Sequence, residues 1–245
     1  MILRDISLPA PQENILFDEV LLFLAEQGIS GESLRFWESA QVFIVLGRIG
    51  RVEEDVFWET ARTDGIPILR RGSGGGTVLQ GKGCLNYSLI LSKEIHPGLG
   101  DLRKSYRMIL DQVVAVMGHV GVKAEFKPIS DIARKDTEKK FSGNAQHRAR
   151  KYILHHGTIL YDFDLSLIEK YLRIPRDVPP YRKGRTHKEF VANIGIPALE
   201  IKTAFRKHFS IKDENTILSE RERQCLQDFL TTKKINVEDG RKINF

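Results

Sequence analysis

The stretch Arg70-Arg71-Gly72-Ser73-Gly74-Gly75-Gly76 decides the fold, because it joins a short apolar run, Ile66-Pro67-Ile68-Leu69, to an alternating segment, Cys84 to Leu91. The context is strand–loop–strand, and not the strand–loop–helix of a P-loop or a dinucleotide-binding turn. Consecutive glycines let the backbone pass close to a ligand with its N–H groups turned outward, which suits an anion. The two arginines add fixed positive charge of a shape that matches phosphate oxygens.

A second segment, Lys140-Phe141-Ser142-Gly143-Asn144-Ala145, combines a lysine with another glycine. Lys140-Phe141 and the stretch Ile153 to Leu160 favour a β pair, so we interpret Gly143 as part of a turn that carries Lys140. The loop and this turn would place positive charge around exposed backbone N–H groups. Together they predict a pocket in which a carboxylate is joined to a phosphate.

Hydrophobic periodicity along the rest of the chain predicts an α+β fold with a mixed, mostly antiparallel sheet and helices packed on it. Helical patterns cover 13–28, 102–118, 165–172, 198–209 and 218–230, and strand patterns cover 33–38, 41–47, 66–69, 84–91 and 122–126. Gly28 fits a helix C-cap. The segment 175–185, rich in proline and arginine, predicts an ordered loop or a mobile lid.

The composition is that of an ordinary globular protein, with 245 residues, 41% hydrophobic residues and a net charge of +6. This charge is compatible with nucleic acid, a phosphorylated ligand or an acidic protein as partner. The two cysteines, Cys84 and Cys225, lack metal-ligand spacing, which argues against a zinc ribbon or a disulfide framework. The first residues do not form a signal-peptide pattern and no apolar run reaches the ~20 residues of a membrane span, so we expect a cytoplasmic protein.

His155 and His156 are adjacent in a predicted strand. Neighbouring strand residues point to opposite faces, so the two rings are not expected to ligate one metal. We expect one of them to be buried and hydrogen-bonded.

The motifs in combination resemble the catalytic domain of the lipoate–protein ligase family, which forms a wider group with octanoyl transferases and, more distantly, biotin ligases. The resemblance rests on Arg70 to Gly76 with Thr77-Val78, on Gly83 and Asn86, on Asp131, on Lys140 to Ala145, and on His155-His156-Gly157-Thr158-Ile159-Leu160. Asn14, Asp18, Glu19, Phe36-Trp37 and Leu46-Gly47-Arg48 fit the same family. It implies a catalytic domain over residues 1–211 and a short helical extension over 212–245 packed on it, in place of the accessory domain of two-domain ligases.

The resemblance further implies ATP-dependent attachment of lipoate, or a related medium-chain acyl group, to a lysine of an acceptor protein through an acyl-adenylate. Lys140 is then the catalytic cation, bridging the acyl carboxylate and the α-phosphate, and Asp131 holds Mg²⁺. Substrate- and nucleotide-binding roles fall on Arg70, Arg71, Ser73, Gly74, Gly75, Gly76, Thr77, Val78, Asn86, Ser142, Gly143, Asn144, Ala145, His156, Gly157 and Thr158. The acceptor would be a lipoyl domain of a 2-oxoacid dehydrogenase, a glycine-cleavage H protein or a dedicated lipoate-binding protein.

Two positions depart from the family pattern. Gln80 stands where many members carry a histidine, and we interpret it as structural or substrate-lining because an amide does not titrate near neutral pH. Ser130 stands where an asparagine usually precedes the aspartate, which bears on the metal role of Asp131.

Three alternatives stay open at the level of sequence. A transferase that forms a cysteine thioester without ATP needs a thiolate at the pocket, and neither 126–139 nor 158–211 contains a cysteine. A biotin ligase would show an Arg-rich loop ending in tryptophan, which the chain lacks. A non-catalytic basic module is suggested by Arg134, Lys135, Lys139, Lys140, Arg148, Arg150 and Lys151, although few aromatic residues are interleaved for stacking on nucleic acid. We interpret that basic stretch as a docking face for an acidic acceptor domain.

Overall fold

The computed structural model of the protein describes residues 1–237. Its strands are β1 (Ile2–Asp5), β2 (Ser33–Trp37), β3 (Phe43–Leu46), β4 (Ile68–Arg70), β5 (Val78–Gln80), β6 (Cys84–Ser92), β7 (Ala124–Lys127), β8 (Asp131–Arg134), β9 (Lys140–Arg148) and β10 (Tyr152–Leu160). Its helices are α1 (Pro11–Glu26), α2 (Val52–Asp55), α3 (Trp58–Thr63), α4 (Leu102–His119), α5 (Ser166–Tyr171), α6 (His187–Phe190), α7 (Ala198–His208) and α8 (Glu220–Thr232), with 3₁₀ turns at Pro97–Gly100 and Pro180–Arg182.

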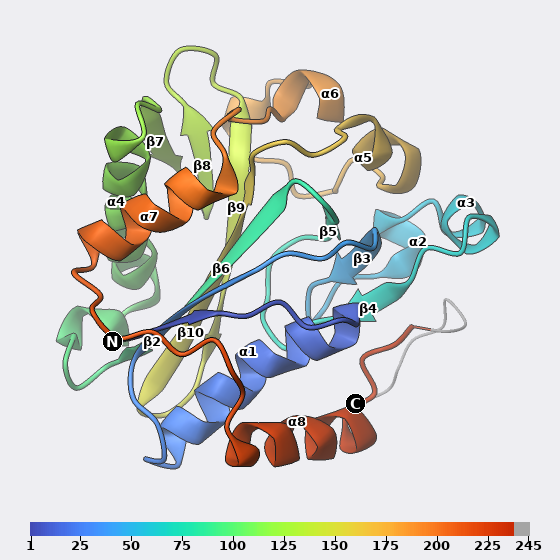
Figure 1. Ribbon diagram of the computed structural model, residues 1–245. Coiled ribbons are helices and arrows are strands. Elements are labelled where there is room, and N and C mark those ends of the chain that lie inside the picture. The colour runs from blue at the N-terminus through green and yellow to red at the C-terminus, as the bar shows by residue number, and fades with distance from the viewer. Residues whose placement is uncertain (238–245) are drawn as a thin grey trace.

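The strands form two sheets that lie side by side (Figure 1). The large sheet has the order β1-β2-β6-β10-β9-β8-β7 and the small one the order β4-β3-β5. In the large sheet β1 and β2 are parallel, and the other neighbours are antiparallel. In the small sheet β3 runs parallel to β4 and antiparallel to β5. The predicted fold class, α+β with a mixed and mostly antiparallel sheet, is therefore confirmed.

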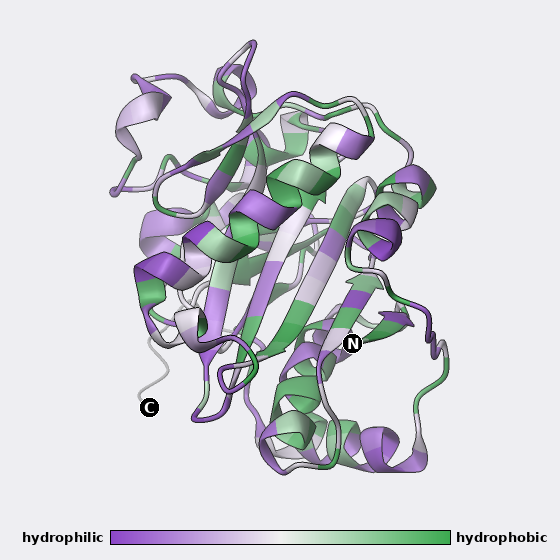
Figure 2. Ribbon diagram, turned by 90° about the vertical axis from the view of Figure 1, so that its left-hand side faces the viewer, coloured by the Kyte–Doolittle hydropathy of each residue, from purple (hydrophilic) through white to green (hydrophobic). Residues whose placement is uncertain are grey.

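Different helices cover the two faces of the large sheet. On one face α4 and α7 pack over the main apolar core, which includes Tyr87, Val113 and Phe205, and Figure 2 shows α4 lying across these strands. On the other face α1 and α8 pack against Ile90 and Leu154. We call these sides the α4 face and the α1 face. Because strand side chains alternate, the register assigns every residue of the central strands to one face or the other.

The predicted glycine turn after Lys140 is wrong. Residues 140–148 form one continuous strand that pairs with β10 on one side and with β8 on the other. Gly143 lies inside that strand, opposite Asp131 and Thr158. An isolated glycine in a strand often marks a bulge or a close approach, and here a bulge lies nearby and Lys140 Nζ approaches Gly143.

Most predicted helices and strands are present, with shifts of a few residues at their ends. The prediction lacked β1, β5, β8, α2, α3 and α6, all of which are short. Gly28 follows α1 with φ +71°, as a C-terminal glycine of a helix does. Among residues 1–237, no helix is long and apolar enough to cross a bilayer.

The last helix, α8, packs against α1, with Cys225 and Leu226 in the same apolar cluster as Leu16 and Val20. Glu222 forms a buried ion pair with Arg4 of β1, with an N–O distance of 2.6 Å. The amphipathic pattern of this segment therefore does cover an apolar surface, except at its start, where Ile217 is 68% exposed. Residues 238–245 of the predicted extension lie outside the described residues.

Leu226→Ala is expected to lower the free energy of unfolding by about 2–4 kcal/mol, because it opens a cavity between α8 and α1. Gln227→Ala, on the exposed side of the same helix, should change it by less than about 0.5 kcal/mol. Urea denaturation of the two variants measures both values. Equal stability of the two would show that α8 contributes nothing to the fold.

Candidate active site

The glycine-rich loop between β4 and β5 is folded around the side chain of Arg71. This buried guanidinium donates to the carbonyl oxygens of Gly74 and Gly76, both at 2.7 Å, and to Ser73 Oγ at 3.0 Å. Burial lowers the pKa of Arg71 to about 10, so it stays charged at neutral pH. Arg71 thus binds the loop itself, and its predicted role as a ligand for phosphate stays a prediction.

The contacts with Arg71 also separate the carbonyl groups of the loop from its N–H groups. Its carbonyls are turned inward to Arg71, whereas within residues 1–237 the N–H groups of Gly74, Gly75 and Gly76 have no acceptor. Gly75 has φ +83°, and its carbonyl oxygen lies so close to Gly47 that a Cβ there would overlap it. A turn with free N–H groups and occupied carbonyls is a site for an anion.

Arg70 also acts on backbone. Its Nη1 donates to the carbonyls of Gly47 and Gly50 at 3.0 and 2.8 Å, and so fixes the neighbouring turn after β3. Thr77 Oγ1 donates to Asp55 of α2 at 2.6 Å, and Val78 pairs with Val45 in the small sheet. These three predicted site residues thus fix the loop to the turn after β3, to α2 and to the small sheet.

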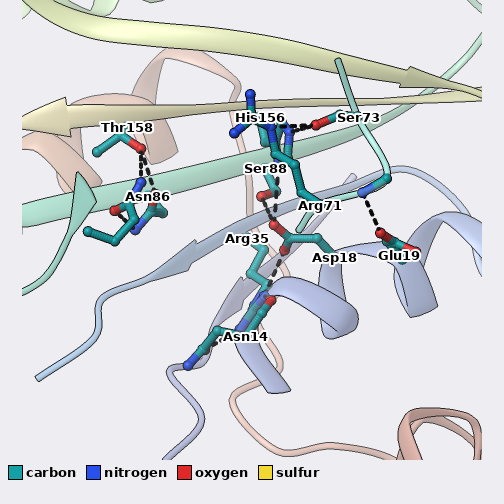
Figure 3. Close-up of polar contacts among 12 residues, drawn as sticks. Asn14, Asp18, Glu19, Arg35, Arg71, Ser73, Asn86, Ser88, His156 and Thr158 are labelled. Carbon is teal, nitrogen blue, oxygen red and sulfur yellow. Dashed lines mark hydrogen bonds and ion pairs between the residues drawn. The ribbon is translucent and has the colours of Figure 1, made fainter. Parts of the chain in front are cut away.

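Two adjacent carboxylates of α1 hold the loop and the sheet together (Figure 3). Glu19 Oε1 accepts from the N–H of Gly72 at 3.0 Å. Asp18 pairs with the fully buried Arg35 of β2 at 2.7 Å and accepts from Ser88 of β6 at 2.6 Å. Burial opposes ionisation of Asp18, but Arg35, His156 and Ser88 together outweigh burial and hold the pKa of that carboxyl below its ordinary value.

His156 joins this network to the loop. Its Nε2 lies 2.6 Å from Ser73 Oγ, and its Nδ1 lies 3.8 Å from Asp18. Its neighbour His155 points to the α4 face, where it accepts from Gln146, and burial lowers its pKa to about 3. The prediction that the two rings diverge and that one is buried is confirmed. No group of three or more metal-ligating side chains exists among the residues that the structure describes.

A β-bulge turns Lys140 toward the site. Ser142 pairs with Ile132 and Lys140 with Ala133, so that Phe141 is an extra residue in β9. Lys140 and Gly143 are an odd number of residues apart and would face opposite sides of a regular strand. With the bulge, Lys140 Nζ instead lies 3.0 Å from the position that a Cβ of Gly143 would take. It forms an ion pair with Asp131 Oδ1 at 2.7 Å.

The second oxygen of Asp131 is also engaged. Tyr181, in the Pro- and Arg-rich segment, donates its hydroxyl to Asp131 Oδ2 at 2.7 Å. Burial and this carboxylate raise the pKa of Tyr181, so its phenol stays protonated. With one oxygen on Lys140 and the other on Tyr181, Asp131 contacts protein groups through both oxygens, and its predicted role as a Mg²⁺ ligand stays a prediction. It holds the ammonium group of Lys140 in place. The segment 175–185 therefore reaches the site through Tyr181.

The register separates the remaining predicted residues by face. Gly143, Ala145, His156, Thr158 and Asn86 lie on the α1 face, toward the loop. Ser142, Asn144 and Gly157 lie on the α4 face, within the core. There Asn144 accepts from the Tyr87 hydroxyl and donates to the carbonyl of Ser130 at 2.8 Å. Gly157 makes room for it, since a Cβ would overlap Asn144 Oδ1.

Asn86 and Thr158 form a closed ring of hydrogen bonds with Gln80. Gln80 Nε2 donates to Thr158 Oγ1 at 2.6 Å, the Thr158 hydroxyl donates to Asn86 Oδ1 at 2.7 Å, and Asn86 Nδ2 donates to Gln80 Oε1 at 3.0 Å. The ring ties the small sheet to the large one. A neutral amide satisfies it at every pH, which gives Gln80 a structural role.

The basic residues of the predicted docking face fall into two groups along β9, and their role in docking stays a prediction. Arg134, Lys135, Lys139 and Lys140 lie at one end of β9, and Arg148, Arg150 and Lys151 lie at the other, roughly 25 Å away along the strand. Arg148 also donates to the carbonyls of Leu99 and Gly100. The first of these two groups contains Lys140 and therefore lies at the candidate site.

Tyr181 is the functional candidate that the sequence did not reveal, since nothing near it in sequence points to Asp131. Asp18 and Glu19 did carry a signal, because two acids follow Leu16 and Phe17 in the middle of an apolar helix pattern. Such acids are buried only when they are paired.

Comparison with known proteins is consistent with this geometry. The family model for the lipoyl protein ligase A/B catalytic domain matches residues 10–210. A probable lipoate–protein ligase A of Mycoplasma pneumoniae is 31% identical over 166 residues, which are 68% of this chain and 47% of that protein. The octanoyltransferase LipM of Geobacillus kaustophilus is 28% identical over 236 residues, which are 85% of this chain and 84% of that protein. The chain therefore spans about half the length of the first relative and most of the second.

Two solved structures share the fold. Lipoate–protein ligase A bound with ATP has a TM-score of 0.80 at 24% identity and covers 95% of this chain, with 94% of its own chain matched. The bi-partite lipoate protein ligase of Thermoplasma acidophilum has a TM-score of 0.78 at 24% identity, with 95% and 93% covered. At this level of identity the likeness shows that the fold is shared, and the reaction depends on the residues of the site.

Gly75→Val is expected to weaken binding of lipoyl-AMP more than about tenfold, because a β-branched residue is strained at φ +83° and its Cβ would crowd Arg71. Gly74→Ala is the matched control, since its Cβ would meet nothing within 4 Å. Calorimetric titration measures binding and circular dichroism measures folding. If Gly75→Val unfolds the chain, or binds as the control does, the loop has a structural role only.

Proposed function

Because the chain belongs to the lipoyl protein ligase A/B catalytic domain family, we propose that it is an ATP-dependent lipoate–protein ligase. In this proposal lipoate is the acyl substrate, ATP the activating nucleotide and a lysine of a lipoyl-type domain the acceptor. Two proteins of similar fold support these choices: one is a lipoate–protein ligase A bound with ATP, and the other is a lipoate protein ligase described with its E2 lipoyl domain.

One observation carries the proposal: Lys140 and the glycine-rich loop meet on the same face of β9. Lys140 Nζ lies over Gly143, and the position of a Cβ at Gly75 lies 3.6 Å from the Cβ of Ala145. Gly143 and Ala145 are two residues apart on one face, which is roughly 7 Å along a strand. An ammonium group and a set of free N–H groups at this spacing suit two anions that must approach each other.

The first half-reaction follows from this geometry. A carboxylate oxygen of lipoate attacks the α-phosphorus of ATP, the bond from that phosphorus to the bridging oxygen breaks, and pyrophosphate leaves. Both reactants are negatively charged, so repulsion opposes their contact. Lys140 offsets this charge between them, and the loop N–H groups bind the other oxygens. Asp131 holds Lys140 in position through their ion pair.

In the second half-reaction a neutral lysine amine of the acceptor attacks the acyl carbon of lipoyl-AMP. The bond from carbon to the phosphate oxygen breaks, AMP leaves, and the amine loses a proton to give the amide. The acceptor is a lipoyl domain or a protein of that type, and the reaction takes place in the cytoplasm.

An octanoyltransferase is the second candidate, because LipM matches most of the chain and most of its own length. A transferase that holds the acyl group as a cysteine thioester needs a reactive thiolate. Cys84 is fully buried in the apolar cluster that includes Ile44 and Leu79 of the small sheet, and burial raises the pKa of its thiol. Cys225 lies between α8 and α1, where burial also raises the pKa. The positions of both thiols favour the ligase.

Lys140→Ala is expected to reduce lipoyl-AMP formation at least about 100-fold, as loss of a transition-state charge contact does. Lys140→Arg should also fail, because a planar fork cannot replace a compact charge over Gly143. Lys139→Ala, the neighbouring lysine, is the control. Mass spectrometry of lipoyl-AMP measures the three rates, and a Lys140→Ala variant as active as the control would remove Lys140 from the site.

The double variant Cys84→Ala/Cys225→Ala is expected to keep more than half of the ligation rate, measured as lipoylation of a lipoyl domain with ATP. Alanine avoids placing a hydroxyl group in the apolar sites of the two thiols. Loss of activity together with an acyl-thioester on either wild-type cysteine, seen by mass spectrometry, would favour the transferase.

A further inference from the structure

The segment that follows α8, Lys233 to Val237, contacts β4, the strand that leads into the glycine-rich loop. The N–H of Arg70 donates to the carbonyl of Ile235 at 2.8 Å, and the N–H of Val237 donates to the carbonyl of Ile68 at 2.9 Å. Leu69 and Asn236 form an antiparallel bridge between these two bonds. The segment thereby adds to the outer edge of β4, the three-residue edge strand of the small sheet.

Lys233 reaches the loop through Glu19. Its Nζ pairs with Glu19 Oε2, while Oε1 of the same carboxylate accepts from the N–H of Gly72. Glu19 is buried, and Lys233 is half-buried with its ammonium group 4.1 Å from the centre of the Phe229 ring. One carboxylate thus connects the end of α8 to the first glycine of the loop.

The contacts act on the part of the loop that must be rigid. Gly72 precedes Ser73, whose hydroxyl contacts His156, and the anion-binding N–H groups come directly after it. Holding a long carboxylate side chain such as that of Glu19 in one geometry costs rotamer entropy. Without a second contact, Glu19 would sample other rotamers and release the N–H of Gly72. Lys233 supplies the second contact that fixes it.

We propose that Lys233 is a positioning residue for the glycine-rich loop, acting through Glu19, and that the segment 233–237 serves as a brace for the acyl-adenylate site. The chain then carries on its own C-terminal segment an element that orders the loop before the substrates bind. The effect on catalysis rests on the proposed function, whereas the effect on the loop does not.

Lys233→Gln is the test, and Lys234→Gln is its matched control, because Lys234 is the exposed neighbour with the same charge. Hydrogen–deuterium exchange of the ligand-free chain reads the loop directly. Lys233→Gln and Glu19→Gln should each speed exchange in the peptide that contains residues 70–77, and the double variant should add little to either. Equal exchange in Lys233→Gln and the control would overturn the brace.

Kinetics give the second measurement. In Lys233→Gln the KM for lipoate should rise about two- to fivefold with kcat little changed, the size of effect that one half-exposed ion pair can supply. Lys233→Arg should restore it. A lower melting temperature with an unchanged KM would show a structural role only and would contradict the proposal.

A charge swap separates positioning from simple pairing. Glu19→Lys with Lys233→Glu restores an ion pair, but a lysine at position 19 cannot accept from the Gly72 N–H. We expect recovery of the melting temperature without recovery of loop protection, and recovery of both would overturn the proposal. If the wild-type chain forms no lipoyl-AMP, the proposed function fails, and the exchange data still decide whether the brace exists.

Discussion

Two buried carboxylates on one turn of α1 are the constraint on which the rest of the site depends. Asp18 and Glu19 are neighbours, so on a helix they point in directions about 100° apart. Asp18 is directed to the sheet, where it pairs with Arg35, and Glu19 to the loop and the C-terminal segment. Removing Arg35 would leave the Asp18 charge buried and uncompensated, which costs about 3–5 kcal/mol. The helix, both sheets and the loop are therefore held in one arrangement.

From this arrangement comes the polarity of the site. Arg71 is charged, yet it lies behind the loop and binds its carbonyls, so that its effect on a ligand passes through the backbone. Lys140 lies on the α1 face, where a bulge in β9 and the Asp131 carboxylate direct it. Tyr181 closes over Asp131 from the Pro- and Arg-rich segment. A nucleotide or an acyl chain would meet free N–H groups on one side and an ammonium group on the other.

The sequence was sufficient for the fold class and for the segments that meet at the site, because periodicity and glycine placement are local properties. It could not show which side of a strand each residue faces after a bulge. Phe141 resets the alternation, so Lys140 joins Gly143 on one face, whereas Asn144 and Gly157 belong to the core. It also could not show that Arg70 and Arg71 bind backbone, or that Tyr181 contacts Asp131 across 50 residues. These contacts depend on tertiary packing, which no local pattern records.

The central claim is that this face of β9 activates a carboxylate by joining it to AMP. Exchange of labelled pyrophosphate into ATP measures that step directly, with no acceptor protein present. The purified chain should catalyse exchange when lipoate is added, none without lipoate or with biotin in its place, and none as the Lys140→Ala variant. Lipoate-independent exchange, or none while the chain still moves an octanoyl group between proteins, would contradict the account.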